Sequence, residues 1–196
     1  MDGTSGRMFN LGEAAVAYAV AAEHMLGEDA SFLENNAAVV PVFVSMLFQS
    51  LEISIKYAGI EAGLFNAKEA RYRQNRSGHG IRELSALAAD RLGGDPFEPI
   101  VTAMTFSTRA ERAAQFVREM ICGESLEKTR ESYASRRLGY GEVREGDFAL
   151  VHPIGEWVEA VKQTAVALPK TIDVLSQWRE STSASRHFAI WLTDGK

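Results

Sequence analysis

The sequence contains a single cysteine, Cys122, among 196 residues. A lone thiol cannot form a disulfide within the chain, and it cannot build a zinc site from cysteine ligands. No cluster of His, Asp and Glu has metal-ligand spacing on one predicted helix face either. We therefore expect no metal and no cofactor, and a protein of a reducing compartment.

The chain also lacks a long apolar run and an excess of positive charge. Its longest apolar stretch, residues 37 to 48, is too short to span a bilayer, and residues 1 to 10 lack the basic start and apolar core of a signal peptide. We expect a cytoplasmic protein. The net charge of -5 at pH 7 argues against attraction of nucleic acid by the chain as a whole, so any phosphate binding must be local.

Two catalytic motifs and the strand pattern are missing as well. There is no phosphate-cradling GxxxxGK[ST] loop and no G-x-S-x-G nucleophile elbow, so an oxidoreductase or an ordinary hydrolase is not indicated. Alternation of period two is absent, whereas helical periods fill the chain. The sequence predicts one all-α domain over residues 1 to 196, a bundle of about five helices with its core at about 10 to 180.

Four helices are predicted over residues 10 to 27, 41 to 63, 80 to 93 and 99 to 121. Asn10 and Glu13 have capping-box spacing, and Pro41 is tolerated in a first turn. The second helix is apolar nearly all round and should be central. The residues expected on buried faces are Leu11, Ala15, Tyr18, Ala22 and Met25, then Ile81, Leu84, Leu87 and Ala88, then Phe106, Ala110, Ala113, Val117 and Met120.

The last predicted helix carries an apolar repeat of 3.5 residues that continues across Pro169, where a kink is expected. Its members are Ile154, Val158, Val161, Ala165, Leu168, Ile172 and Leu175. Such a seam can pair with a second subunit, so a homodimer is predicted. Residues 123 to 146 are rich in charge and are expected to form a solvated insertion. The tail, residues 183 to 196, ends in apolar residues that should dock onto a partner surface.

Polar residues form a stripe along the otherwise apolar second helix. Ser45, Gln49, Glu52 and Lys56 are spaced four, three and four residues apart, so they share one face. This stripe either faces water or lines a site. For Glu52 and Lys56 two interpretations stay open, an ion pair on a half-exposed face and a ligand-facing role.

A cluster of basic residues precedes the third helix. Residues 71 to 80 contain Arg71, Arg73, Arg76 and His79 and no acidic residue, which makes this loop the best local candidate for binding an anion. The alternative is a solvated loop in which His79 only caps the following helix.

Two segments of this region form ordered motifs. Residues 50 to 60, SLEISIKYAGI, place Glu52 four positions before Lys56 among apolar residues. Residues 78 to 84, GHGIREL, place His79 ahead of apolar residues that open another helix.

A third segment, residues 133 to 142, reads YASRRLGYGE, and its notable residues are Tyr133, Arg136, Arg137 and Tyr140. The two arginines beside an aromatic ring could bind a nucleotide by charge and stacking, or could be ordinary surface residues. In their order and spacing, the three segments resemble the HEPN domains, the higher eukaryote and prokaryote nucleotide-binding helical domains. The resemblance covers roughly residues 35 to 180.

This resemblance implies a bundle of four or five helices, commonly dimeric, that acts in RNA or nucleotide transactions of defence or toxin-antitoxin systems. A nucleotidyltransferase-type antitoxin is among the partners that it implies. Many members are metal-independent ribonucleases, in which a His moves protons and an Arg stabilises phosphorane charge. In that family the Arg and the His are separated by about four to six residues near the start of the last long helix.

In this chain, seven residues separate Arg144 from His152 at the corresponding place. Five residues separate Arg73 from His79, but this pair precedes the third helix instead. We therefore expect a HEPN-like domain that binds RNA, a nucleotide or a cognate partner without strong catalysis. Two alternatives stay open: an endoribonuclease with one of these rearranged Arg and His pairs, and a structural interaction module.

Overall fold

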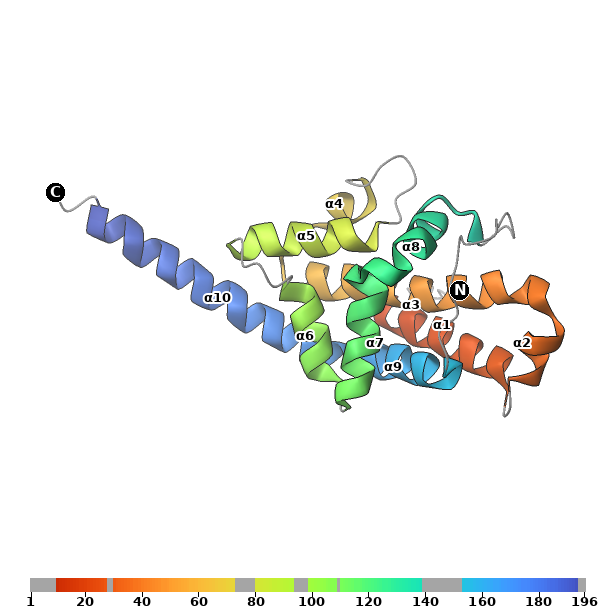
Figure 1. The fold of residues 1–196 in the computed structure, drawn as a ribbon. Coiled ribbons are helices and arrows are strands. Elements are labelled where there is room, and N and C mark those ends of the chain that lie inside the picture. Colours follow the sequence, from red (N-terminus) through yellow and green to blue (C-terminus); the bar gives the residue numbers. More distant parts are fainter. Residues whose placement is uncertain are drawn as a thin grey trace, which may run out of the picture.

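The structure is a computed structural model that describes residues 10–27, 30–72, 80–93, 99–108, 110–138 and 153–193, without the side chains of residues 71, 72 and 184–193. Within these ranges the chain is helical and has no strand (Figure 1), which confirms the all-α prediction. The helices are α1 (Leu11–Leu26), α2 (Ser31–Asn35), α3 (Val40–Glu61), α4 (Ala67–Tyr72), α5 (Ile81–Leu92), α6 (Pro99–Ser107), α7 (Glu111–Cys122), α8 (Glu127–Ala134), α9 (Ile154–Val166) and α10 (Leu168–Thr193), with 3-10 turns at Ala37–Val39 and Glu124–Leu126.

The described residues therefore form ten α-helices instead of about five. Two of the predicted helices are each divided into two, and α2, α4 and α8 are additional short helices. Glycines, which favour helix ends, directly follow α1, α5 and α7.

The central helix is α3, which packs against α1, α5, α9 and α10. Its largest fully buried side chains are Phe43, Phe48, Leu51 and Ile55. Residues 37–61 are long and apolar enough to cross a membrane by length and composition, but 61% of the apolar 18-residue window within them is buried inside the chain. Burial against neighbouring helices explains this apolar character without a membrane.

The first predicted helix is confirmed as α1, and its predicted buried face is correct at Ala15 and Ala22 but wrong at Leu11 and Tyr18. Asn10 caps the helix by accepting a hydrogen bond from the Gly12 amide at 2.9 Å. The fully buried residues are Ala15, Ala19 and Ala22, whereas Leu11 and Tyr18 are 44% and 39% exposed. Small alanines permit a close approach to α3, and the Ser50 hydroxyl donates to the Ala15 carbonyl at 2.8 Å.

The prediction of one continuous helix over residues 99 to 121 is wrong, because the helix is interrupted between α6 and α7. Hydroxyl groups compete with the helical hydrogen bonds there: Ser107 donates to the Ala103 carbonyl and Thr108 to the Thr105 carbonyl. Ala110 is extended, and Phe106, expected to be buried, is 64% exposed.

The seam over residues 154 to 175 is divided between α9 and α10. Ala167 separates the two helices, and Pro169 lies in the first turn of α10, where it costs no backbone hydrogen bond. The seam residues pack inside this same chain: Ile172 is partly buried, and Ile154, Val158, Val161, Ala165, Leu168 and Leu175 are buried. The seam therefore cannot be the surface through which two copies meet, and the predicted homodimer needs another one.

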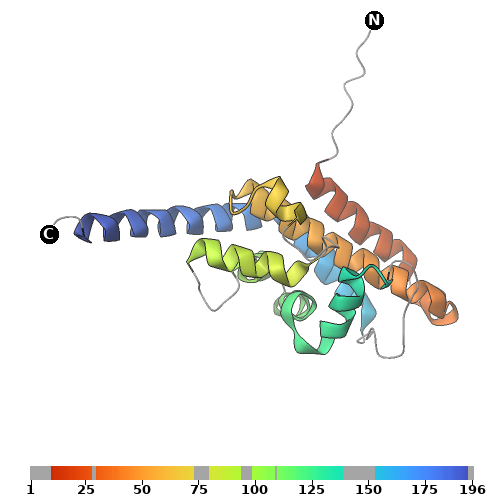
Figure 2. The same cartoon turned by 90° about the horizontal axis from the view of Figure 1, so that it is seen from above.

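Beyond its first half, α10 leaves the rest of the bundle. Figures 1 and 2 show this helix, in blue, running away from the other helices toward the C-terminus. The predicted docking of the tail concerns side chains that lie outside the described residues.

A glycine within α3 generates the first prediction. A Cβ atom at Gly59 would lie 2.0 Å from the Phe65 ring, which is buried directly against this backbone. We expect Gly59→Ala to lower the free energy of unfolding by about 1 to 3 kcal/mol, as in other overpacked cores. Urea denaturation measures this difference.

Gly155→Ala in α9 is the matched control, because the nearest atom to its Cβ would be Leu26 Cδ2 at 3.8 Å, an ordinary contact. This variant should be neutral or more stable by up to about 1 kcal/mol. Equal effects of the two substitutions would show that Phe65 does not pack on Gly59.

Candidate functional site

A buried carboxylate lies on the central helix. Glu52 is 1% exposed and forms an ion pair with Lys56 one turn later. The Tyr133 hydroxyl of α8 donates to Glu52 Oε2 at 2.5 Å and lies 3.0 Å from Gln49 Oε1. Since an unpaired buried charge costs on the order of several kcal/mol, this network fixes α8 against α3.

Tyr133 is held by packing as well as by its hydroxyl. Its ring stacks on Phe48, with centroids 5.3 Å apart and planes inclined by 25°. Burial raises the pKa of Tyr133 far above the ordinary value near 10, and the charge and hydrogen bond of Glu52 raise the pKa further. The hydroxyl therefore stays protonated and acts as a donor to the carboxylate.

A buried arginine attaches α8 to a second helix. Arg130 is 8% exposed, and its guanidinium donates to the carbonyls of Glu119 at 3.0 Å, Met120 at 3.3 Å and Gly123. These groups are at the end of α7, where carbonyls lack helical partners and a cation is favourable. Burial lowers the pKa of Arg130, but three acceptors satisfy the guanidinium.

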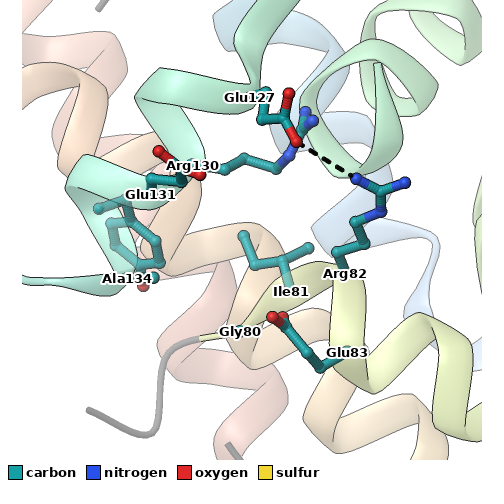
Figure 3. A pocket seen from close by; sticks show the side chains of 9 residues that line it. Gly80, Ile81, Arg82, Glu83, Glu127, Arg130, Glu131 and Ala134 are labelled. Atoms are coloured by element: carbon teal, nitrogen blue, oxygen red, sulfur yellow. Dashed lines mark ion pairs between the residues drawn. The ribbon is translucent and has the colours of Figure 1, made fainter. Parts of the chain in front are cut away.

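A cavity of about 150 Å³ lies between the start of α5 and one face of α8. Figure 3 shows the side chains of both helices converging on it. The lining residues are Gly80, Ile81, Arg82, Glu83, Glu127, Arg130, Glu131, Tyr133 and Ala134. The cavity is smaller than the roughly 300 to 1,000 Å³ of pockets that enclose whole ligands, so it can hold only one small group of a larger ligand.

The described wall of this cavity is not basic. Arg82 and Glu127 face each other at 3.7 Å, and both side chains are more than half exposed, so the pair contributes little stability. Glu83 and Glu131 add two more carboxylates to the wall, and the guanidinium of Arg130 already donates hydrogen bonds to backbone carbonyls. A phosphate would need cations from the segments next to the cavity.

The predicted ion pair between Glu52 and Lys56 is confirmed, but its half-exposed setting is wrong. Glu52 is fully buried, because the polar stripe of α3 faces Tyr133. Ser45 and Gln49, one and two turns earlier on the same stripe, are partly buried. The middle of the stripe therefore packs against α8 instead of facing water, and none of its four residues belongs to the wall of the cavity between α5 and α8.

Arg136 and Arg137 directly follow α8. Arg137 donates to the hydroxyls of Ser135 at 3.1 Å and Ser132 at 3.2 Å. Arg136 is exposed and adopts a left-handed backbone conformation with φ of 64°. Both arginines therefore lie at the end of α8 that follows Tyr133 and Ala134, two residues of the cavity wall.

The other predicted site residues lie outside the described residues: Arg73, Arg76, His79, Tyr140, Arg144 and His152. His79 directly precedes Gly80, which caps α5 without a side-chain hydrogen bond and lines the cavity. Whether His79 caps the helix or contacts phosphate stays a prediction.

The three segments that carry the HEPN resemblance meet in the structure. The described part of the second segment begins with Gly80 and Ile81. These two residues line the same cavity as Tyr133 and Ala134 of the third segment. Tyr133 in turn bonds Glu52 of the first. Residues far apart in the sequence thus form one connected region at the edge of the bundle.

The sequence pattern does not single out Arg130, and its charge predicts that residues 123 to 146 are solvated. As far as residue 138 that segment is less solvated than its composition predicts, because Leu126, Tyr133 and Leu138 are buried. The signal that could have revealed this is the spacing of Leu126, Arg130 and Tyr133, four and three residues apart, which defines one face of a helix.

Comparisons with protein-family models, with curated proteins and with solved structures found no match. Among the described residues, no three His, Cys, Asp or Glu side chains are grouped so that they could hold a metal ion. The proposal for function therefore depends on the geometry of this region and on the sequence.

Removing the Tyr133 hydroxyl tests the network. We expect Tyr133→Phe to lower the free energy of unfolding by about 1.5 to 3 kcal/mol, the range for hydrogen bonds to charged groups. Tyr57→Phe is the control, since among the described residues its hydroxyl accepts an exposed 3.3 Å bond from Asn10. Denaturant midpoints that are the same for both variants would contradict the role of Tyr133.

The raised pKa of Tyr133 also predicts a dependence of stability on pH. Above the ordinary tyrosine pKa of about 10, the unfolded chain loses this proton while the folded chain keeps it. The stabilisation is complete below about pH 10 and falls as the pH rises, by at most about 1.4 kcal/mol per pH unit.

The advantage of the wild type over Tyr133→Phe should therefore shrink between about pH 9 and about pH 11. Parallel urea titrations of the two proteins isolate this effect from other groups that ionise in alkali. A constant difference over that interval would mean that Tyr133 ionises normally in the folded protein.

Proposed function

We propose that this chain is a HEPN-like helical domain that binds single-stranded RNA or a nucleotide at the junction of α5 and α8, without cleaving it. The observation that carries the proposal is the meeting of the three resembling segments around Tyr133. The resemblance also suggests a homodimer that acts in defence or with a nucleotidyltransferase-type antitoxin, and the composition of the sequence suggests a cytoplasmic location.

The charge of the flanking segments supports an anionic ligand. Residues 71 to 80 contain three arginines and one histidine without an acidic residue, and this segment leads directly into Gly80 of the cavity wall. On the other side, Arg136 and Arg137 follow α8. The cavity can accept one base or sugar, and the positive charge of the two flanking segments favours phosphates on either side.

The weakness of the catalytic pattern supports binding without cleavage. Cleavage by this family needs an Arg and a His that reach one phosphodiester together. The spacing of Arg144 and His152 departs from the family pattern, and Arg73 and His79 precede a different helix. The ionisable groups that line the described cavity are arginines, carboxylates and a tyrosine with a raised pKa, and no histidine is among these lining residues.

The test measures binding of a mixed-sequence, fluorescently labelled single-stranded RNA by anisotropy in EDTA at two salt concentrations. The double variant Arg73→Ala with Arg76→Ala should bind about tenfold more weakly or worse. The logarithm of its affinity should also depend less steeply on the logarithm of salt concentration, by about two units of slope. Arg136→Ala with Arg137→Ala should behave similarly, provided that its thermal unfolding is unchanged.

The charge-matched control is Arg112→Ala with Lys170→Ala, two exposed cations of α7 and α10 that are outside the cavity wall. Equal losses of RNA affinity in all three double variants, or no RNA binding at low salt, would contradict the proposal. Either result would favour a protein partner instead. Cleavage that disappears in His79→Ala or His152→Ala would show that the domain is a ribonuclease.

A further inference from the structure

A second hollow of the molecule lies where α10 leaves the bundle. This groove has a volume of about 480 Å³ and is formed by the end of α5, by α6, by α7 and by α10. Its apolar lining residues include Leu92, Phe106 and Trp178, and Arg118 lines it as well. The groove is separate from the cavity between α5 and α8, and the proposed RNA binding does not use it.

The groove exposes apolar surface that a monomer in water would be expected to cover. Phe106 is 64% exposed, the largest exposed fraction among the large hydrophobic residues of the described chain. Trp178 is only partly buried although it lies on the face of α10 that packs against the core. On the same wall, the Thr102 hydroxyl oxygen is buried without a hydrogen-bond partner among the described residues.

The second half of α10 presents the complementary feature. The backbone is helical to Thr193, and it runs away from the other helices in both views (Figures 1 and 2). Residues 188 to 192 read FAIWL. Five successive residues cover the full circumference of a helix, so this end is apolar all round and requires enclosure on more than one side.

We propose that two copies of this chain form a twofold-symmetric dimer in which the C-terminal end of each α10 inserts into the groove of the other copy. The groove includes Trp178, Ser181 and Thr182 of α10, and the apolar end begins ten residues after Trp178, about 15 Å along the helix. Two antiparallel α10 helices that cross near Ser185 place residues 188 to 192 of each copy opposite residues 178 to 182 of the other.

The sequence at the crossing point fits this arrangement. Residues 181 to 185, STSAS, are all small and permit two helix axes to approach closely. Because the groove and the apolar end belong to the same helix, a single twofold operation fills both grooves and leaves no unpaired apolar end, which gives a closed dimer. In this dimer the two copies meet through the second half of α10 and not through the buried seam of α9 and α10.

A membrane is a weaker explanation of the apolar end. A run of five apolar residues is far below the roughly 20 that span a bilayer, and insertion into lipid would leave Phe106 and the groove exposed. A second copy accounts for both features at once.

The decisive measurement is the molar mass of the full chain in solution by light scattering after gel filtration. The wild type should have the mass of a dimer. Phe106→Glu in the groove and Trp191→Glu at the helix end should each halve that mass, and circular dichroism should show unchanged helicity. Phe32→Glu is the matched control, because Phe32 is a 50% exposed aromatic residue on α2, and this variant should remain dimeric.

Cross-linking tests the antiparallel geometry. In a Cys122→Ser background, Ser185→Cys should form a disulfide between the two copies on mild oxidation, because the crossing brings the two positions together. Gln177→Cys should not, since its two copies would be about 24 Å apart along the axis. A monomeric wild type, a dimer that survives both glutamate substitutions, or a monomer that binds phosphatidylcholine vesicles through Trp191 would each overturn the proposal.

Discussion

The arrangement of this bundle depends on one buried carboxylate. Glu52 lies on the most apolar helix of the chain at 1% exposure, a position where an isolated charge would be strongly unfavourable. Lys56 supplies the opposite charge from the same helix, but it cannot satisfy both carboxylate oxygens from one side. The second oxygen requires a donor from elsewhere, and Tyr133 provides it. The short and polar helix α8 is therefore held against α3 because the buried carboxylate of Glu52 needs the hydrogen-bond donor of Tyr133.

The attachment of α8 has consequences for the neighbouring helices. Arg130, three residues before Tyr133, turns toward α7 and satisfies its last carbonyls. The two side chains thus fix α8 against two helices at once, and the remaining face of α8 is left to form the wall of the cavity with α5. Since Tyr133 belongs both to the network and to that wall, the shape of the cavity depends on the protonation and pairing of groups inside the core.

The sequence predicts helix positions well where local signals are strong. The Asn10 cap, Pro41 in the first turn and Gly93 after α5 each act within one turn, and the observed bounds of α1, α3 and α5 follow them closely. The break between α6 and α7 was missed because apolar spacing continued across hydroxyl groups that bond back to the helix. The burial of Glu52 could not be predicted, because its partner lies 81 residues further along the chain. Likewise, a repeat of 3.5 residues fits packing within one chain as well as packing between two.

Helix α5 contributes residues to both the cavity and the groove. The cavity begins at Gly80 and Ile81, at the start of α5, and the groove includes Leu92 at its end. Ile81 and Leu92 are separated by about 16 Å of helix, and α5 packs against α3, α6 and α7 along its length. A ligand that displaces α5 at either end therefore changes the shape of the other site, because a packed helix moves as a unit. Any such coupling is reciprocal: if nucleotide binding shifts α5, self-association through the groove and ligand affinity at the cavity change by the same factor.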